Sequence, residues 1–182
     1  MTEEIYDIFD IAGGRTGTAS WTECHTKGLL HRCVSALIFR DESKRETLIQ
    51  QRSLAMAHNP GLWTHAAGGH VLTGDSVERG MLTELQEELF WRNKLPAVSL
   101  RKIVTFFNHD MPNNREFITL FDAVYPGPFD PNPSEVAGAP CWIEWQTLVD
   151  AMREDPGRFA PVFHTVVDVY SRPHDFRLGP QF

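Results

Sequence analysis

The chain has 182 residues, of which 42% are hydrophobic and 23% are charged, and its formal net charge at pH 7 is −7. This size and composition predict one globular domain with a substantial core, and the negative charge disfavours a nucleic-acid-binding surface. The sequence has no apolar run long enough to span a membrane and no signal peptide at its acidic N-terminus, so we expect a cytoplasmic protein without a membrane partner. Three widely spaced cysteines without a C-x-x-C pair indicate neither a disulfide framework nor a cysteine zinc site.

The first half of the chain predicts short strands, followed by a helix. Strands are expected at residues 5–10, 18–23, 33–40, 47–51 and 63–67, of which 33–40 and 47–51 form a hairpin. Residues 25–31 are expected to be a loop. A helix should follow Gly68-Gly69, with Asp75 as its N-cap and Glu78 completing a capping box.

The second half predicts longer strands, a proline-rich loop and two helices. Strands are expected at 100–108, 115–125 and 141–145, and helices at 147–153 and 161–172. Loops are expected at 109–114 and at 126–133, where four prolines fall within eight residues. The tail from Pro173 is expected to be disordered. This order of elements predicts an α+β fold, a mixed sheet with helices packed on its faces.

Three glutamates on the central helix are the first functional signal. Glu84, Glu87 and Glu88 have i, i+3 and i+4 spacing, so their side chains project from one helical face and repel one another. Acidic helical faces are often only solvated, but a Gly-Gly pair and a Gly-Asp turn precede this one. That combination favours a cation site, and oxygen ligands suit Mg²⁺ or Mn²⁺ acting on a phosphorylated substrate.

Counted from Gly69, the chain follows most of the pattern G-x5-E-x7-R-E-U-x-E-E-x-G-U, in which U is aliphatic, and it therefore resembles the Nudix box. Asp75 stands in place of the first Glu, Thr83 in place of Arg and Phe90 in place of the last Gly. The resemblance implies the Nudix α/β/α sandwich as a single domain over residues 1–182, with an N-terminal extension to about residue 31. It also implies metal binding by Glu84, Glu87, Glu88 and the carbonyl oxygen of Gly69.

Segments outside the box, such as PGLWTHAAGGHV and EVAGAPCWIEW, resemble the Nudix subgroup related to isopentenyl-diphosphate isomerase. That resemblance implies a second metal site at His25, His31, His70 and Glu116. Packing of His25 and His31 within the N-terminal segment, without a metal, is the alternative. The isomerase also needs a cysteine for proton transfer at carbon, and this chain has Gly68 at that position; Asn114 stands where a second acid is expected.

The intact glutamates and the missing thiol make a hydrolase the expected function. The Nudix resemblance implies hydrolysis of a diphosphate joined to another group, for example a nucleoside diphosphate linked to a second moiety. Glu84 and Glu87 would act at the metal, and Glu135 would be the general base, with Glu116 as its rival. An isopentenyl-diphosphate isomerase and a non-catalytic nucleotide or metabolite sensor are the alternatives.

Substrate contacts are expected from two further residues. Arg52 begins a loop, residues 52–63, of the kind that determines the substrate in this family. Phe106 is expected to bind the substrate by stacking on a nucleobase, a role that Phe107 and Phe129 could also fill. The expected partner is a small-molecule diphosphate, and a homodimer is expected because dimers are common.

Overall fold

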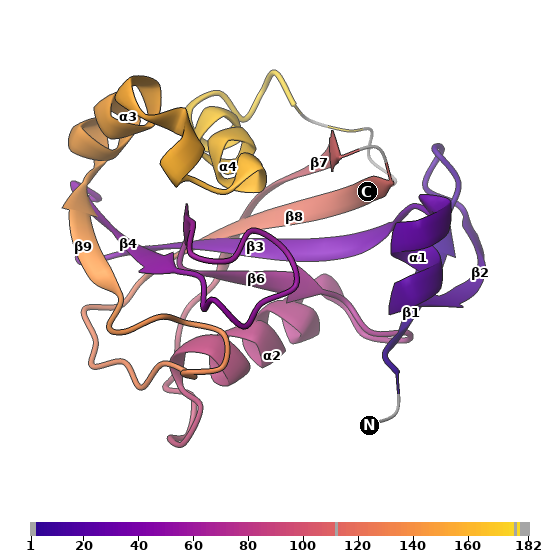
Figure 1. Ribbon diagram of the computed structural model, residues 1–182, viewed down its shortest axis with the longest axis horizontal. Helices are drawn as coiled ribbons and strands as arrows, with labels where there is room; N and C mark the ends of the chain where they lie inside the picture. Colours follow the sequence, from indigo (N-terminus) through magenta and orange to yellow (C-terminus); the bar gives the residue numbers. More distant parts are fainter. Residues whose placement is uncertain (1–2, 112, 177, 179–182) are drawn as a thin grey trace.

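A mixed β-sheet between two layers of helices forms the centre of the molecule (Figure 1). The computed structural model describes residues 3–111, 113–176 and 178. The strands are β1 Ile5–Phe9, β2 Arg15–Ser20, β3 His31–Phe39, β4 Glu46–Gln51, β5 Trp63–Thr64, β6 Ala67–His70, β7 Arg101–Met111, β8 Asn114–Val124 and β9 Cys141–Glu144. The helices are α1 Trp21–Lys27, α2 Val77–Leu89, α3 Trp145–Glu154, the 3-10 helix η1 Pro156–Arg158 and α4 Pro161–Ser171. The expected α+β sandwich is confirmed.

Strand β3 is the centre of the sheet and fixes the register of the site. Eight of its nine residues are buried, as expected for an apolar strand that helices cover on both faces. It pairs in parallel with β8, which places His31 opposite Glu116. It also pairs antiparallel with β6, which places Cys33 opposite His70. Residues that are far apart in the sequence therefore lie on neighbouring strands.

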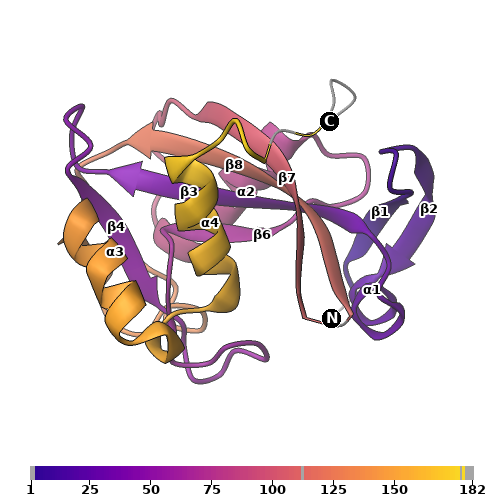
Figure 2. The ribbon, with the colours of Figure 1, turned by 90° about the horizontal axis from the view of Figure 1, so that it is seen from above.

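Each face of the sheet has its own hydrophobic core. The first core joins the sheet to α3 and α4 and includes Leu37, Phe106 and Phe163. The second core joins the opposite face to α2 and includes Ile38 and Leu85. Figure 2 shows α3 and α4 on one face of the sheet, while β1, β2 and α1 lie together at one end of it.

The N-terminal extension departs from the predicted elements. The strand predicted at 18–23 ends at Ser20, and the loop predicted at 25–31 is wrong because helix α1 covers its first three residues. Ser20 Oγ accepts a hydrogen bond from Glu23 N, and the Glu23 carboxylate accepts one from Ser20 N, so a capping box starts the helix. Gly28 ends it with φ 63°, in the left-handed region. His25 consequently projects from a helix.

The N-cap of helix α2 lies one residue later than predicted. Its N-cap is Ser76, whose hydroxyl accepts a hydrogen bond from Arg79 N at 3.2 Å, so the predicted capping by Asp75 and Glu78 is wrong. Ser and Asp are comparable N-caps, and the sequence places both before the helix. The shift leaves the phase of the three glutamates unchanged.

The connection between β7 and β8 and the C-terminal tail also differ from prediction. Strands β7 and β8 shorten the loop expected at 109–114, and Pro112 of that loop lies outside the described residues. Residues 173–176 form a turn whose Phe176 packs against the first core, so the disorder expected from Pro173 is wrong there. The rest of that tail, residues 177 and 179–182, lies outside the described residues. None of the described helices is long and apolar enough to cross a membrane.

Candidate active site

A pocket of about 430 Å³ lies where α2, β6, β3 and β8 meet the loop of residues 52–62. Among the described strands β6 pairs with β3 alone, which leaves one of its edges open to side chains from α2. Two groups of ionisable side chains meet in this region. The glutamate cluster consists of Glu84, Glu87, Glu88 and Glu135. The histidine cluster consists of His25, His31, His70 and Glu116.

The absence of a side chain at Gly69 lets Glu84 reach the sheet. A Cβ atom on Gly69 would lie 2.5 Å from Cδ of Glu84, so any other residue there would displace this carboxylate. Burial, followed by the charges of Glu88 and Glu87, holds the pKa of Glu84 well above its ordinary value. Carboxylates this close repel unless a cation neutralises them. Carboxylate oxygens are ligands that Mg²⁺ and Mn²⁺ prefer. Among the described residues, however, the histidine cluster is the one group of His, Cys, Asp and Glu side chains whose ligand atoms converge closely enough to hold a metal.

Glu88 is the most constrained member of the glutamate cluster. Its Oε1 accepts a hydrogen bond from Gly68 N at 2.8 Å, and its Oε2 accepts one from Gln50 Nε2. Burial raises the pKa of Glu88 to about 7, although both hydrogen bonds act in the opposite direction. Glu88 therefore connects α2 to β4 and β6 by hydrogen bonds and also contributes a carboxylate to the cluster.

Glu135 and Arg52 join the glutamate cluster from loops. Asn132 Nδ2 donates a hydrogen bond to Glu135 Oε1 at 3.0 Å, which orients this carboxylate. Burial raises the pKa of Glu135, while the positive charge of Arg52 lowers it. Burial also raises the pKa of Glu87, and the charge of Glu135 adds to that shift. Arg52 is the one Lys or Arg among the described residues that line the pocket. The sequence predicted this residue as a substrate contact.

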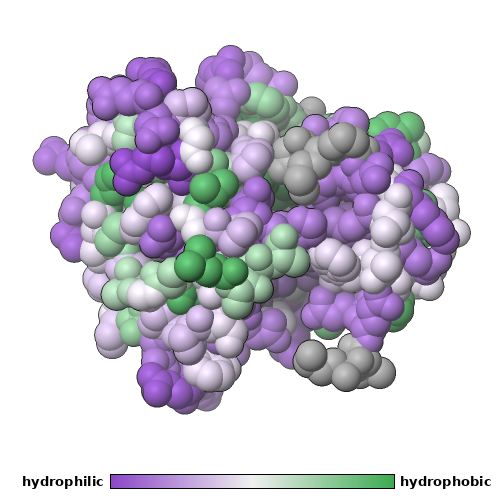
Figure 3. Space-filling view, viewed as in Figure 1, coloured by the Kyte–Doolittle hydropathy of each residue, from purple (hydrophilic) through white to green (hydrophobic). Residues whose placement is uncertain are grey.

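The loop of residues 52–62 forms an outer wall of the pocket. Met56, Ala57, His58 and Asn59 line the pocket, whereas Leu54 points away and is 82% exposed. The space-filling view shows apolar side chains gathered near the centre of this face, where Figure 1 places the loop (Figure 3). The entrance therefore combines apolar wall atoms with one cation.

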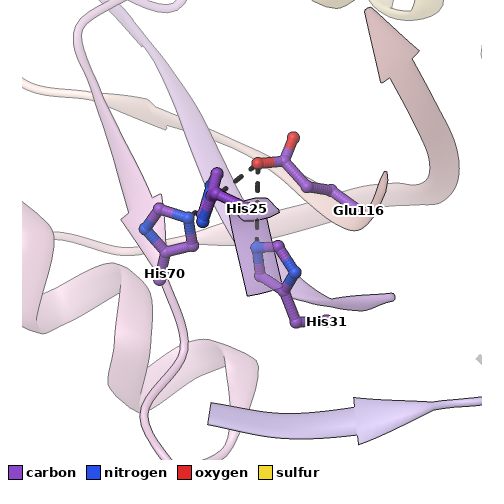
Figure 4. Close-up of side chains that lie close together, drawn as sticks. All are labelled: His25, His31, His70 and Glu116. Carbon is purple, nitrogen blue, oxygen red and sulfur yellow. Dashed lines mark ion pairs between the residues drawn. The ribbon is translucent and has the colours of Figure 1, made fainter. Parts of the chain in front are cut away.

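The histidine cluster joins one residue each from α1, β3, β6 and β8 (Figure 4). One candidate ligand atom from each of the four residues lies within 4.8 Å of all the others. Oε1 of Glu116 is 4.0 Å from Nε2 of both His31 and His70. Asn108 Nδ2 donates a hydrogen bond to the other oxygen, Glu116 Oε2, at 3.0 Å. The second predicted metal site is therefore assembled in space.

Backbone carbonyls orient two of these imidazoles. The carbonyl oxygens of Trp21 and Leu29 lie 3.0 Å and 2.8 Å from Nδ1 of His25 and His31, respectively. Nδ1 therefore carries the proton, and Nε2 keeps a lone pair for a ligand. Nε2 of His31 and Nε2 of His70 are buried without a hydrogen-bond partner in the described part of the chain. Such orphaned nitrogens fit a metal ion better than they fit core packing.

Burial keeps the three imidazoles of the histidine cluster neutral. It lowers the pKa of His31 to about 4 and the pKa of His25 below its ordinary value. Burial also holds the pKa of His70 well below the ordinary value, and the neighbouring histidines add to this shift. Neutral imidazole is the form that binds a metal.

Aromatic rings that the sequence did not assign to the site pack around the histidine cluster. The ring of Tyr6 stacks on His70 at 4.8 Å, and Trp21 stacks on His25 at 4.5 Å. His58 lies 5.8 Å from His25, although it comes from the loop of residues 52–62. No spacing in the sequence relates these residues to the box, because three separate segments bring them together.

The structure separates the two candidate bases and corrects one substrate contact. Glu135 lies with the box glutamates, whereas Glu116 lies with the histidines. Phe106 is 1% exposed in the first core, so its prediction as a substrate-binding residue is wrong. Because Phe107 follows it on a strand, the two rings point to opposite faces, and the sequence does not say which face is buried.

Phe90, which replaces a box glycine, also belongs to a core. It is 3% exposed and packs against Tyr125 and Phe129 with ring centroids 5.5 Å and 5.8 Å away. Its φ of −133° needs no glycine. Nothing in the structure explains Thr83.

The NUDIX domain profile matches residues 29–163 of this chain. The chain is 32% identical to an isopentenyl-diphosphate Delta-isomerase of Serratia proteamaculans, over 91% of this chain and 90% of the relative. It is 29% identical to the isopentenyl-diphosphate Delta-isomerase of Burkholderia multivorans, over 91% and 92% of the two chains.

Solved structures show the same fold. DR0079 from Deinococcus radiodurans has a TM-score of 0.74 at 21% identity, with 92% of this chain and 99% of that chain covered. The NUDIX domain of Shewanella oneidensis NrtR, solved with ADP ribose, has a TM-score of 0.57 at 17% identity, with 80% and 87% covered.

Proposed function

The chain belongs to the NUDIX domain family, and from this premise we propose that it is a metal-dependent hydrolase of an organic diphosphate. The observation that carries the proposal is the glutamate cluster. Glu84, Glu87 and Glu88 share one helical face, and the missing side chain at Gly69 leaves room for the Glu84 carboxylate against β6. Glu88 is buried and Glu84 is partly buried, and both have raised pKa values, so their negative charges would destabilise the fold unless a cation neutralised them.

Each residue has a role that follows from its place. Glu84, Glu87 and the Gly69 carbonyl would hold Mg²⁺ or Mn²⁺, with Glu88 as a further carboxylate. The bound ion would polarise phosphate oxygens and offset the charge of the cluster. Glu135 would take the proton from the attacking water, because burial raises its pKa and Asn132 holds its carboxylate in the pocket.

The positive charge of Arg52 suits a diphosphate substrate. It faces Glu88 and Glu135, whose pKa values it lowers, so its guanidinium is close to the glutamate cluster. Arg52 Nε donates a hydrogen bond to the carbonyl oxygen of His58 at 2.9 Å, which fixes the side chain and leaves its other N–H groups for phosphate oxygens.

The test is a screen for phosphate or diphosphate release from organic diphosphates, with Mg²⁺ and Mn²⁺ compared. The panel should include nucleoside diphosphate derivatives, among them ADP-ribose, and isoprenoid diphosphates. Metal-dependent release from one compound supports the hydrolase. Tight binding of one compound without release from any would instead support the sensor.

An isomerase is the second candidate, because the named relatives are isomerases and the histidine cluster is complete. Cys33 is the one cysteine among the described residues that line the pocket, and its Sγ donates a hydrogen bond to Glu116 Oε1 at 3.4 Å. Gly68 has no thiol, and a Cβ atom there would lie 2.7 Å from the carbonyl oxygen of Val34. Conversion of isopentenyl diphosphate to its dimethylallyl isomer by the purified protein would replace the hydrolase proposal.

A further inference from the structure

His65 is a buried pocket residue that neither cluster uses. It lies between β5 and β6, is 5% exposed, and lines the pocket. Its ring packs against Phe163 of α4, with centroids 5.8 Å apart. The imidazole is therefore held between the first core and the cavity.

The tip of this ring fills the space beside Gly68. A Cβ atom on Gly68 would lie 2.6 Å from His65 Nε2, which is closer than any real side chain allows. Positions 65 and 68 therefore compete for one volume, and here the imidazole occupies it. Gly68 N is bonded to Glu88, so the ring tip lies beside the backbone that positions the glutamate cluster.

A neighbouring hydroxyl determines which nitrogen carries the proton. Thr64 Oγ1 lies 3.1 Å from His65 Nδ1, and Thr64 is 3% exposed. This is the one side-chain hydrogen bond of Thr64 in the described part of the chain, so its buried hydroxyl proton must point at Nδ1 or remain unsatisfied. Thr64 therefore donates to Nδ1, and the proton of His65 is on Nε2, where no described residue accepts it.

The ring is neutral as well as oriented. Burial lowers the pKa of His65 to about 3, and the charge of Arg52 acts in the same direction. A neutral donor can bind an anionic oxygen beside carboxylates without forming a salt bridge with them. Arg52 is the one Lys or Arg of the described lining, so uncharged donors such as this imidazole would add to the contacts that Arg52 and a bound metal ion make with an anionic ligand.

We infer that His65 is a substrate-binding residue whose Nε2–H donates a hydrogen bond to an anionic oxygen of the bound diphosphate. This inference rests on the proposed function, since it takes a diphosphate as the ligand. The ring of His65 would make this contact from the space that a side chain at position 68 would otherwise fill.

The test measures the affinity of inorganic diphosphate for the full chain by calorimetry, in the presence of Mg²⁺. His65→Leu keeps an apolar contact with Phe163 but removes the donor, and His65→Gln restores an N–H. His164→Leu is the matched control, because His164 lies on α4 and its Nε2 contacts the carbonyl oxygen of Pro156, away from the pocket. Thermal unfolding of each variant reports whether it is folded.

We expect His65→Leu to weaken binding about 10- to 100-fold, the usual effect of losing a hydrogen bond to a charged group. His65→Gln should remain within about threefold of the wild type, and His164→Leu within about twofold. Thr64→Val keeps the imidazole and its packing but removes the hydroxyl that holds the proton of His65 on Nε2, so it should weaken binding by a few-fold. This variant tests the inference even if His65→Leu does not fold.

Wild-type affinity in folded His65→Leu, or an equal loss in His65→Gln, would overturn the inference. So would unchanged binding in Thr64→Val if His65→Leu is unfolded, or failure of the wild type to bind inorganic diphosphate. If the wild type binds it, and loses affinity as described, but hydrolyses no compound of the panel, the proposed reaction fails while His65 keeps its role.

Discussion

The glutamate cluster and the histidine cluster share one pocket but are built in opposite ways. Three of the four glutamates come from one helix, whose periodicity alone puts them together. The four members of the histidine cluster come from four elements, which only the pairing of β3 with β6 and β8 and the packing of α1 bring together. The first cluster crowds negative charge, whereas the second collects neutral rings. One cavity therefore presents a site of carboxylates alone beside a site made mainly of neutral imidazoles.

The largest expected difference between the clusters is in catalysis. Glu87→Gln should lower kcat for diphosphate hydrolysis with Mg²⁺ by about 10³-fold, because a carboxylate at the metal is worth several kcal/mol in the transition state. His31→Gln should change it by less than about tenfold. Phosphate release is the measurement, with circular dichroism to confirm folding. The reverse order of effects would move the reaction to the histidine cluster.

The two candidate bases give the next largest contrast. Glu135→Gln should lower kcat by about 10²- to 10⁴-fold, as expected for loss of a general base. Glu116→Gln should have a much smaller effect, since Glu116 lies among the histidines. The pH–rate profile should lose its acidic limb in Glu135→Gln alone. Equal losses in both variants would mean that neither cluster works without the other.

Metal preference should also separate the clusters. After loading with Zn²⁺ and dialysis, the wild type should retain Zn²⁺, because imidazoles are favoured ligands of this ion. His70→Gln should bind Zn²⁺ about 100-fold more weakly. Glu87→Gln should retain it. Elemental analysis measures the stoichiometry, and an equal zinc content in wild type and His70→Gln would leave the histidine cluster without a metal.

The smallest expected effects are on stability without metal, and they have opposite signs. Glu88 has a raised pKa of about 7, so its folded form binds more protons than its unfolded form, and its contribution is lost as pH rises from about 4.5 to 7. His31 has a lowered pKa of about 4, so its contribution is lost as pH falls from about 6.5 to 4.

Each variant should lack the pH dependence of the group that it removes. Compared with the wild type, His31→Gln should lack a gain in stability as pH rises from about 4 to 6.5, and Glu88→Gln should lack a loss of stability as pH rises from about 4.5 to 7, each by up to about 1.4 kcal/mol per pH unit. Urea unfolding between pH 4 and 8 without metal measures both slopes. Parallel curves for the two variants would contradict the opposite pKa shifts of Glu88 and His31.

Local sequence patterns predicted the parts of this protein that depend on neighbours within one turn or one strand. The buried β3 and the helix with three glutamates are of this kind, because an apolar run of strand length and an i, i+3, i+4 spacing are signals that lie within one segment of the chain. The strand and loop predicted over α1 failed, since the local alternation outweighed a capping signal at Ser20 and Glu23.

The tertiary structure alone decided which distant residues meet. Family resemblance suggested the four histidine-cluster members, but their distances follow from the register of β3 with β6 and β8. Phe106 and Phe107 are the same residue type in adjacent positions, and only packing decides that Phe106 is in the core. The imidazole of His65 occupies the volume beside Gly68 for the same reason: the sequence specifies which atoms are present, and long-range packing decides which of them compete for space.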